Sequence, residues 1–260
     1  MNLNQLLQKH FSDIRSTYTK RDTMLYALGV NACRYPLDEN ELQFCYERNL
    51  QSVPSISCVL AHPGFWVNEP ALEINWVKLV HAEQRFNLAT VLPIEGEVVG
   101  KYRIKSVVDK GPEKGALLAF EKALYTTSGS LLGTVDSTYF LRGDGGTPDD
   151  ELPSPPATAP SGAVETTTLP TAALIYRLSG DYNPLHGDPA VAQKAGFDRP
   201  ILHGLCTFGI ACQQLVRAVC ANDAQRLRGL GGSLHQACIP WRNDSDRILG
   251  KHSRHCSSAA

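Results

Sequence analysis

One stretch of the chain, residues 143–170, sets the limits on what it can fold into. It is rich in proline and glycine, contains no aromatic residue, and includes the run Pro-Ser-Pro-Pro at 153–156. Proline removes a backbone donor and glycine raises the entropic cost of ordering, so a regular helix or strand is disfavoured there. We therefore interpret 143–170 as a linker that follows a first unit, 1–142, and precedes a second unit that begins at residue 171.

The composition indicates a globular protein without strong electrostatic character. The chain has 260 residues, of which 43% are apolar, and this is enough to bury a large core. A net charge of -1 predicts no electrostatic binding to nucleic acid or to a membrane surface. No apolar run approaches the roughly 18 residues that a membrane-spanning helix needs. The eight cysteines show no Cys-x-x-Cys spacing and are expected to be reduced thiols.

The first unit is predicted to combine short helices with an antiparallel meander. Helices are expected from Asp22, as its cap, to Asn31 and over 39–46. Strand-like runs cover 97–109, 116–126 and 130–142, and short turns rich in glycine join them. Short turns between β-prone runs favour antiparallel pairing of neighbours.

The second unit contains the clearest helical pattern, over 204–219. Leu205, Phe208, Cys212 and Leu215 recur at helical spacing, whereas Gln213 falls on the opposite face. So broad an apolar stripe is typical of a core helix that packs on a sheet.

Residues with catalytic potential lie just before this helix. Asp181, Asn183 and His186 fall within six residues, and Pro184 excludes a regular helix or central strand there. A carboxylate and an imidazole in one pocket can hold a water molecule and move its proton. Gly204 follows at the helix start, where backbone N–H groups lack internal partners and can stabilise an oxyanion.

A structural interpretation of the same residues stays open from spacing alone. The Asp-x-Asn-Pro-x-His pattern also occurs as an Asx-turn with a surface histidine. A glycine before a helix commonly has only a conformational role in the backbone. His186, Asp188 and His203 offer metal-binding atoms, but no further ligand has suitable spacing, so no metal is predicted.

Two longer runs carry a family resemblance. Ser-Gly-Asp-Tyr-Asn-Pro-Leu-His at 179–186 and Arg-Pro-Ile-Leu-His-Gly-Leu-Cys-Thr-Phe-Gly at 199–209 closely resemble the (R)-specific enoyl-CoA hydratase 2 family of MaoC-like dehydratases. In the first unit, Val-His-Ala-Glu-Gln at 80–84 and Val-Asp-Lys-Gly at 108–111 resemble segments with which eukaryotic members contact the CoA ester. The resemblance extends over most of the chain.

The resemblance implies an α+β double hot-dog fold, in which two antiparallel sheets each wrap a helix. Residues 1–142 would form the N-terminal hot-dog, enlarged to hold a long or bulky acyl chain. Residues 171–232 would form the catalytic hot-dog, which we expect to be incomplete. The implied activity is that of a hydro-lyase, (R)-specific hydration of trans-2-enoyl-CoA to (3R)-3-hydroxyacyl-CoA in fatty-acid β-oxidation.

The resemblance also implies roles for individual residues. Asp181 and His186 would activate the water that attacks C3 and supply the proton for C2, with Asn183 positioning their turn. The Gly204 N–H would bind the thioester oxygen. Contacts to the CoA substrate are expected from His81, Ala82, Lys110, Tyr182, Pro184 and Leu185. Ala82 stands where the family usually has glycine. No metal or redox cofactor is expected, because the thioester already acidifies C2.

The expected partners are enoyl-CoA and hydroxyacyl-CoA, and a second copy of the chain in a homodimer. Binding to nucleic acid or a membrane is not expected. The resemblance suggests a peroxisomal location, and otherwise a cytoplasmic one. Two alternatives stay open, namely a hot-dog acyl-CoA thioesterase, which would direct water at the thioester carbonyl, and a non-catalytic acyl-CoA-binding remnant.

The tail, 233–260, departs from the family pattern. Synonymous codons for residues 234–247, read one nucleotide forward, encode Phe-Thr-Lys-Pro-Val-Tyr-Pro-Gly-Glu-Thr-Ile-Arg-Thr-Glu, the segment that the family has after Gly231-Gly232. We therefore interpret the tail as the product of a frameshift. Without its last strands the second sheet would expose unpaired edges, so we expect the chain to be poorly stable.

Overall fold

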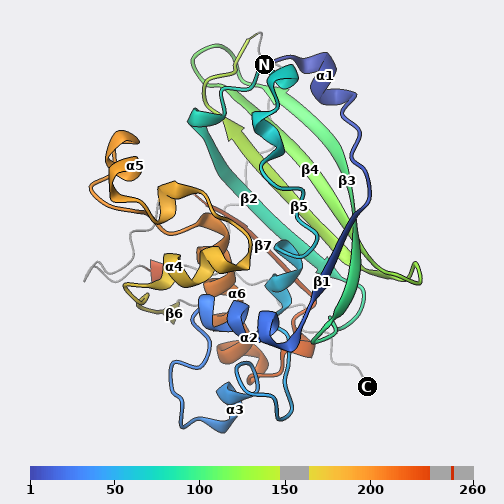
Figure 1. The fold of residues 1–260 in the computed structure, drawn as a ribbon, viewed down its shortest axis with the longest axis vertical. Helices are drawn as coiled ribbons and strands as arrows, with labels where there is room; N and C mark the ends of the chain where they lie inside the picture. Colours follow the sequence, from blue (N-terminus) through green and yellow to red (C-terminus); the bar gives the residue numbers. More distant parts are fainter. Residues whose placement is uncertain (147–163, 235–246, 249–260) are drawn as a thin grey trace.

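A six-stranded antiparallel sheet lies beside a layer of helices in the computed structural model, which describes residues 1–146, 164–234 and 247–248 (Figure 1). The strands follow the order β1-β3-β4-β5-β2-β7. Their bounds are β1 Ile14–Tyr18, β2 Leu79–Leu88, β3 Gly96–Asp109, β4 Ala116–Thr126, β5 Leu131–Leu141 and β7 Gly229–Ser233. A separate two-stranded ladder pairs β6 (Val164–Glu165) with β8 (Arg247–Ile248).

Six α-helices occur in the described part of the chain, α1 Leu3–Leu7, α2 Lys20–Gly29, α3 Glu39–Leu42, α4 Ala172–Tyr176, α5 Pro189–Lys194 and α6 Gly204–Cys220. Short 3-10 turns connect several elements, η1 Pro54–Cys58, η2 Trp66–Asn68, η3 Pro70–Leu72, η4 Trp76–Lys78, η5 Arg177–Ser179, η6 Pro184–His186 and η7 Ala224–Arg226. None of the described helices has both the length and the apolar character that crossing a bilayer requires.

The predicted meander is present, because β3, β4 and β5 pair antiparallel with neighbours along the chain. Their bounds agree with the expected runs to within one residue. The turn between β3 and β4 requires Gly115, whose φ is +76° and whose added Cβ would collide with the Leu141 carbonyl oxygen. Strong strand propensity and sharp turns together made this part predictable.

Strand β2 was not predicted, although it becomes the centre of the functional half of the sheet. It pairs with β5 on one side and β7 on the other. The register shifts between His81 and Glu83, so the two-residue alternation breaks at this bulge. A strand with an irregular burial pattern lacks the two-residue periodicity from which strands are predicted.

The predicted bounds of two helices are wrong. Helix α2 begins at Lys20, because Thr19 and Asp22 form a capping box around its first turn, so Asp22 is the third helical residue and not the cap. Helix α3, expected over 39–46, ends at Leu42, and irregular turns follow it.

Helix α6 confirms the expected core helix and anchors the second unit to the sheet. Phe208, Ile210, Cys212 and Val216 are buried along it. Gln213 is also buried, so the prediction that it lies on the opposite, polar face is wrong. The Phe208 ring meets the ring of Phe86 on β2 edge to face, with 6.0 Å between centroids. Burial of these side chains holds the start of α6 at a fixed place over β2.

The α+β hot-dog class is confirmed, but the described residues of the second unit form no separate large sheet. Strand β7 joins the edge of β2, and β6 and β8 are two residues each. Most of the predicted linker, 147–163, and most of the tail, 235–246 and 249–260, lie outside the described residues. The boundaries 1–142 and 171–232 therefore stay predictions.

Gly209 on α6 lies close to residues at the end of α2. A Cβ added there would lie 3.0 Å from the Tyr26 Oη and would overlap the Val30 side chain. We expect Gly209→Ala to lower the free energy of unfolding by about 1–3 kcal/mol through overpacking, although alanine is the better helix former. Urea denaturation measures the change. Ala218→Gly, at an exposed position of α6, is the control for helix propensity alone, and we expect it to lower the free energy of unfolding by up to about 1 kcal/mol. An increase in stability for Gly209→Ala would contradict the packing.

Candidate active site

The turn that follows α4 is held in shape by its own side chains. Gly180 adopts a φ of +118°, which allows the chain to reverse after η5. The Asn183 N–H donates to the Asp181 Oδ1 at 3.1 Å, and the Asn183 Oδ1 accepts from the Leu185 N–H at 3.0 Å. Two consecutive Asx-turns thus fix the Asp181 carboxylate relative to η6, and Asn183 occupies a position suited to its predicted positioning role.

His186 ends η6 and is 9% exposed. Its Nδ1 lies 2.9 Å from the carbonyl oxygen of Ile201. A carbonyl only accepts, so the proton resides on Nδ1 and the Nε2 lone pair is available. Burial lowers the pKa of His186, which keeps the ring neutral at neutral pH. A neutral imidazole with a free Nε2 is a suitable general base.

His203 joins this turn to the start of α6. Its side chain is 1% exposed, and its ring stacks on that of His186 with 3.8 Å between centroids and 27° between planes. Its Nε2–H donates to the backbone oxygen of Asp181 at 3.1 Å. Burial and the neighbouring His186 lower the pKa of His203 to about 4. Sequence spacing indicated His203 only as a possible metal ligand, because its contacts join residues far apart in the chain.

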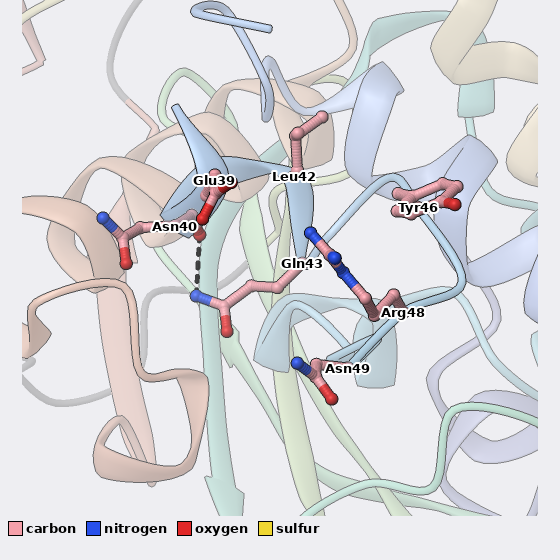
Figure 2. Close-up of a pocket in the computed structure, with 7 residues that line it drawn as sticks. All are labelled: Glu39, Asn40, Leu42, Gln43, Tyr46, Arg48 and Asn49. Atoms are coloured by element: carbon pink, nitrogen blue, oxygen red, sulfur yellow. Dashed lines mark hydrogen bonds between the residues drawn. The ribbon is translucent and has the colours of Figure 1, made fainter. Parts of the chain in front are cut away.

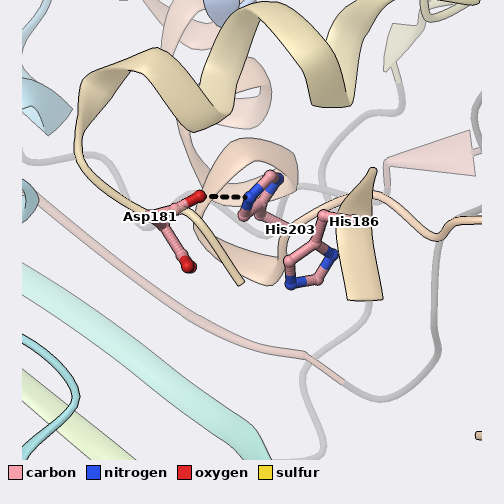
Figure 3. A group of neighbouring side chains, drawn as sticks. All are labelled: Asp181, His186 and His203. Atoms are coloured by element: carbon pink, nitrogen blue, oxygen red, sulfur yellow. Dashed lines mark hydrogen bonds between the residues drawn. The ribbon is translucent and has the colours of Figure 1, made fainter. Parts of the chain in front are cut away.

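Figure 3 shows Asp181, His186 and His203 as one cluster, and one potential ligand atom from each lies within 4.8 Å of the others. The structure thus supplies, in Asp181, the further ligand that sequence spacing did not indicate. Ring nitrogens bind metals in the ring plane, and the two stacked rings are nearly parallel, so their lone pairs do not converge on one ion. The absence of a metal cofactor stays a prediction.

Gly204 starts α6, and no side chain caps this helix, so its first N–H groups are available to a ligand. A Cβ at Gly204 would lie 2.9 Å from the Leu234 Cδ1 and 3.8 Å from the His81 Cβ. The Leu234 N–H donates to the Ala82 carbonyl oxygen at 2.7 Å. The β2 bulge with His81 and Ala82 therefore lies at the start of α6. The contact of these two residues with substrate stays a prediction.

The other predicted substrate-contacting residues divide into two groups. Tyr182, Pro184 and Leu185 lie on the turn itself, and the guanidinium of Arg177 stacks 5.1 Å from the Tyr182 ring centre. Lys110 is exposed in the turn between β3 and β4, at the end of the sheet remote from α6 (Figure 1). The structure does not bring Lys110 to the Asp181 turn, so its contact with substrate stays a prediction.

A hollow of about 390 Å³ lies beside α3 (Figure 2). Its lining residues are Glu39, Asn40, Leu42, Gln43, Tyr46, Arg48 and Asn49. It contains no imidazole or thiol and shares no residue with the Asp181 turn. The functional site is therefore assigned to the Asp181 turn.

Comparison with known proteins shows the family of the chain. The family described as the MFE-2 hydratase 2 N-terminal domain matches residues 16–143, and the family described as the MaoC-like domain matches 151–230. A peroxisomal enoyl-CoA hydratase 2 of Arabidopsis thaliana is 35% identical, over 92% of this chain and 84% of that protein. The chain belongs to the hydratase 2 family of MaoC-like dehydratases.

Two further relatives support the family membership. An enoyl-CoA hydratase of Mycobacterium tuberculosis is 34% identical, over 92% of this hydratase 2 chain and 86% of that protein. The crystal structure of a MaoC-like dehydratase from Phytophthora capsici superimposes with a TM-score of 0.78 at 30% identity, covering 92% of this chain and 86% of that one. The similarity to this family therefore extends over nearly the whole chain.

The depressed histidine pKa values predict acid sensitivity of this hydratase 2 protein. His203 is neutral when folded, with a pKa of about 4, against an ordinary value of 6.5. The unfolded chain therefore binds more protons than the folded one between these values, and stability falls as pH falls from about 6.5 to about 4. We expect His203→Gln to flatten this dependence in thermal unfolding. His10→Gln, at an exposed histidine, is the control, and an unchanged slope for His203→Gln would contradict the assignment.

Proposed function

We propose that this protein is a hydro-lyase that adds water to trans-2-enoyl-CoA and forms (3R)-3-hydroxyacyl-CoA. One observation carries the proposal: the Asp181 turn, the neutral His186 and the uncapped start of α6 at Gly204 are held together by His203. The names of the relatives in Arabidopsis thaliana and Mycobacterium tuberculosis, both enoyl-CoA hydratases, support the same reaction.

The acid–base chemistry follows from the orientation of the two side chains. The Asp181 Oδ1 accepts the Asn183 N–H, and the His186 Nδ1–H is engaged by Ile201, so the remaining lone pairs can accept from one water molecule. The water oxygen bonds to C3 while its proton passes to the Asp181–His186 pair. The pair returns a proton to C2, so the addition balances without a redox partner.

Charge that develops on the thioester oxygen needs a donor at the opposite end of the reacting carbons. The first N–H groups of α6, at Gly204, are free of a side-chain cap and carry the positive end of the helix dipole. Glycine there lets the carbonyl approach the backbone, and such a donor is typically worth about 10²–10³-fold in rate. His81 and Ala82, on the adjacent bulge, would border the thioester.

The wider setting of the reaction is part of the same proposal. The substrate class is acyl-CoA thioesters, turned over in fatty-acid β-oxidation. A peroxisomal location and a homodimeric assembly are proposed from the resemblance, and the relative in Arabidopsis thaliana is named as peroxisomal.

Asp181→Asn and His186→Gln test the chemistry directly. Each removes one acid–base group, so we expect the hydration rate to fall by about 10²–10⁴-fold while the unfolding midpoint changes little. The assay follows the loss of ultraviolet absorbance of a trans-2-enoyl-CoA, with chiral analysis of the product. Asp198→Asn, at an exposed position near the same segment, is the matched control. Wild-type rates in either site variant, or release of free CoA from a saturated acyl-CoA, would overturn the assignment in favour of another activity.

The tail from about Ser233 is proposed to be out of frame with the family segment. Within the described ranges β7 pairs only with β2, so its other edge carries backbone groups to which a restored segment could add a strand. Leu234, the first residue expected to change, packs on Gly204.

Genomic sequence around the Ser233 codon tests the frame. We expect a one-nucleotide shift that restores the family segment, and a corrected protein with a higher unfolding midpoint and faster hydration, because the sheet edge is covered. A supported transcript that encodes the tail as it stands, and yields a fully active, cooperatively unfolding protein, would refute the frameshift.

A further inference from the structure

Two cysteines, Cys33 and Cys45, lie together on either side of the short helix α3. They are twelve positions apart in the sequence, and Cys33 follows α2 whereas Cys45 follows α3. Both are half-buried free thiols. The other cysteines within the described ranges are buried, namely Cys58, Cys206, Cys212 and Cys220. An oxidant in solution therefore reaches Cys33 and Cys45 ahead of these four.

The Cys33 sulfur lies inside the turn that ends α3. Its S–H donates to the carbonyl oxygen of Glu41 at 2.9 Å. The same sulfur accepts hydrogen bonds from the Cys45 thiol and from the Phe44 N–H. The two sulfur atoms are thus in hydrogen-bonding contact, and a disulfide requires them to approach to about 2.05 Å. Formation of the bond therefore needs only the closing of an existing contact.

The two thiols differ in their tendency to ionise. The hydrogen bond from the Cys45 thiol lowers the pKa of Cys33, and this effect outweighs burial and the Glu41 carboxylate, which act in the opposite direction. Donation of that hydrogen bond, together with burial, raises the pKa of Cys45. Because the thiolate is the reactive form of cysteine, Cys33 is the nucleophile of the pair and Cys45 keeps its proton.

The turn around the two thiols is held in place by Glu41, which is 3% exposed. Its Oε2 accepts from the Tyr35 N–H at 3.1 Å, and its Oε1 lies 3.2 Å from the Nε of Arg217 on α6. Cys33 adopts a φ of +56°, in the left-handed region that residues with a Cβ rarely occupy. Such a conformation persists only where the surrounding structure enforces it. The docking of α3 on α6 therefore keeps the two sulfur atoms in contact.

We propose that Cys33 and Cys45 form a reversible disulfide when the protein meets a hydroperoxide, so that the end of α3 is an oxidative modification site. The Cys33 thiolate attacks one peroxide oxygen, the O–O bond breaks, and Cys33 becomes a sulfenic acid while water or an alcohol leaves. The Cys45 sulfur then attacks the Cys33 sulfur, the S–O bond breaks, and water leaves with the Cys45 proton. The two thiols lose two electrons, which the peroxide gains, and a dithiol reverses the bond by exchange.

The disulfide is expected to stabilise the fold without changing the Asp181 turn. It would close the loop 33–45 and so restrict the unfolded chain. Glu41, inside this loop, is paired with Arg217 near the end of α6. Arg217 is thirteen residues beyond Gly204, which is about 20 Å along the helix axis. The modification site and the candidate active site therefore lie at opposite ends of α6.

Peptide mapping of the full chain tests whether the bond forms. Trypsin cleaves after Arg21, Arg34 and Arg48, so Cys33 and Cys45 fall in separate peptides, 22–34 and 35–48. After treatment with hydrogen peroxide and digestion without reductant, we expect these two peptides to be linked, and dithiothreitol to separate them. Unlinked peptides after treatment, or either cysteine linked to a different one, would overturn the proposal.

Serine variants test the order of the two steps. Cys45→Ser lacks the second thiol, so peroxide should leave a sulfenic acid on Cys33 that dimedone traps in peptide 22–34. Cys33→Ser is the matched control, and we expect its Cys45 to be labelled at least about tenfold more slowly, because this thiol keeps its proton. Equal labelling of the two variants would overturn the assignment of Cys33 as the nucleophile.

Thermal unfolding measures the consequence for the fold. We expect the oxidised wild-type protein to unfold about 5–10 °C higher than the reduced protein, and peroxide to give no such rise in Cys45→Ser. No rise in a wild-type sample that contains the linked peptides would overturn the stabilising role. The hydration rate of the oxidised protein should stay within about twofold of the reduced rate, and a larger loss would contradict the separation of the two sites. The peptide map and the unfolding midpoint decide the proposal even if the protein hydrates no enoyl-CoA.

Discussion

The site depends on the contact that His203 makes with a turn about twenty residues earlier in the chain. Its Nε2–H holds the Asp181 carbonyl, and its ring supports that of His186. Because His203 immediately precedes α6, the same residue fixes the distance from the carboxylate and imidazole to the Gly204 N–H groups. Helix α6 is in turn held on β2 by buried side chains such as Phe208. The packing of the core therefore sets the distances between the candidate catalytic groups.

Much of the fold could be predicted where local signals agree with one another. Strands β3, β4 and β5 combine β-prone runs with glycine turns, and α6 has apolar residues that recur at helical spacing. Strand β2 was missed because its bulge at Ala82 breaks the alternation that a sequence search relies on. The start of α2 was misplaced because Thr19 and Asp22 act as a reciprocal pair, and a single capping residue does not reveal which partner comes first.

The candidate catalytic residues could be predicted because they lie together in one short turn. The contacts that hold this turn against the rest of the protein could not be predicted. Asp181, Asn183 and His186 are local, and their Asx-turns follow from the side chains themselves. The stacking of His203 and the approach of Leu234 to Gly204 join segments whose separation in sequence carries no signal.

A structure of the protein with (3R)-3-hydroxybutanoyl-CoA bound tests the account most directly. The arrangement described here requires the 3-hydroxyl group to lie between the Asp181 carboxylate and the His186 Nε2, and the thioester oxygen to accept from the N–H at Gly204. A complex in which the thioester carbonyl carbon faces Asp181, or in which the CoA ester binds away from α6, would contradict the account and would favour attack on the carbonyl or a non-catalytic binding role.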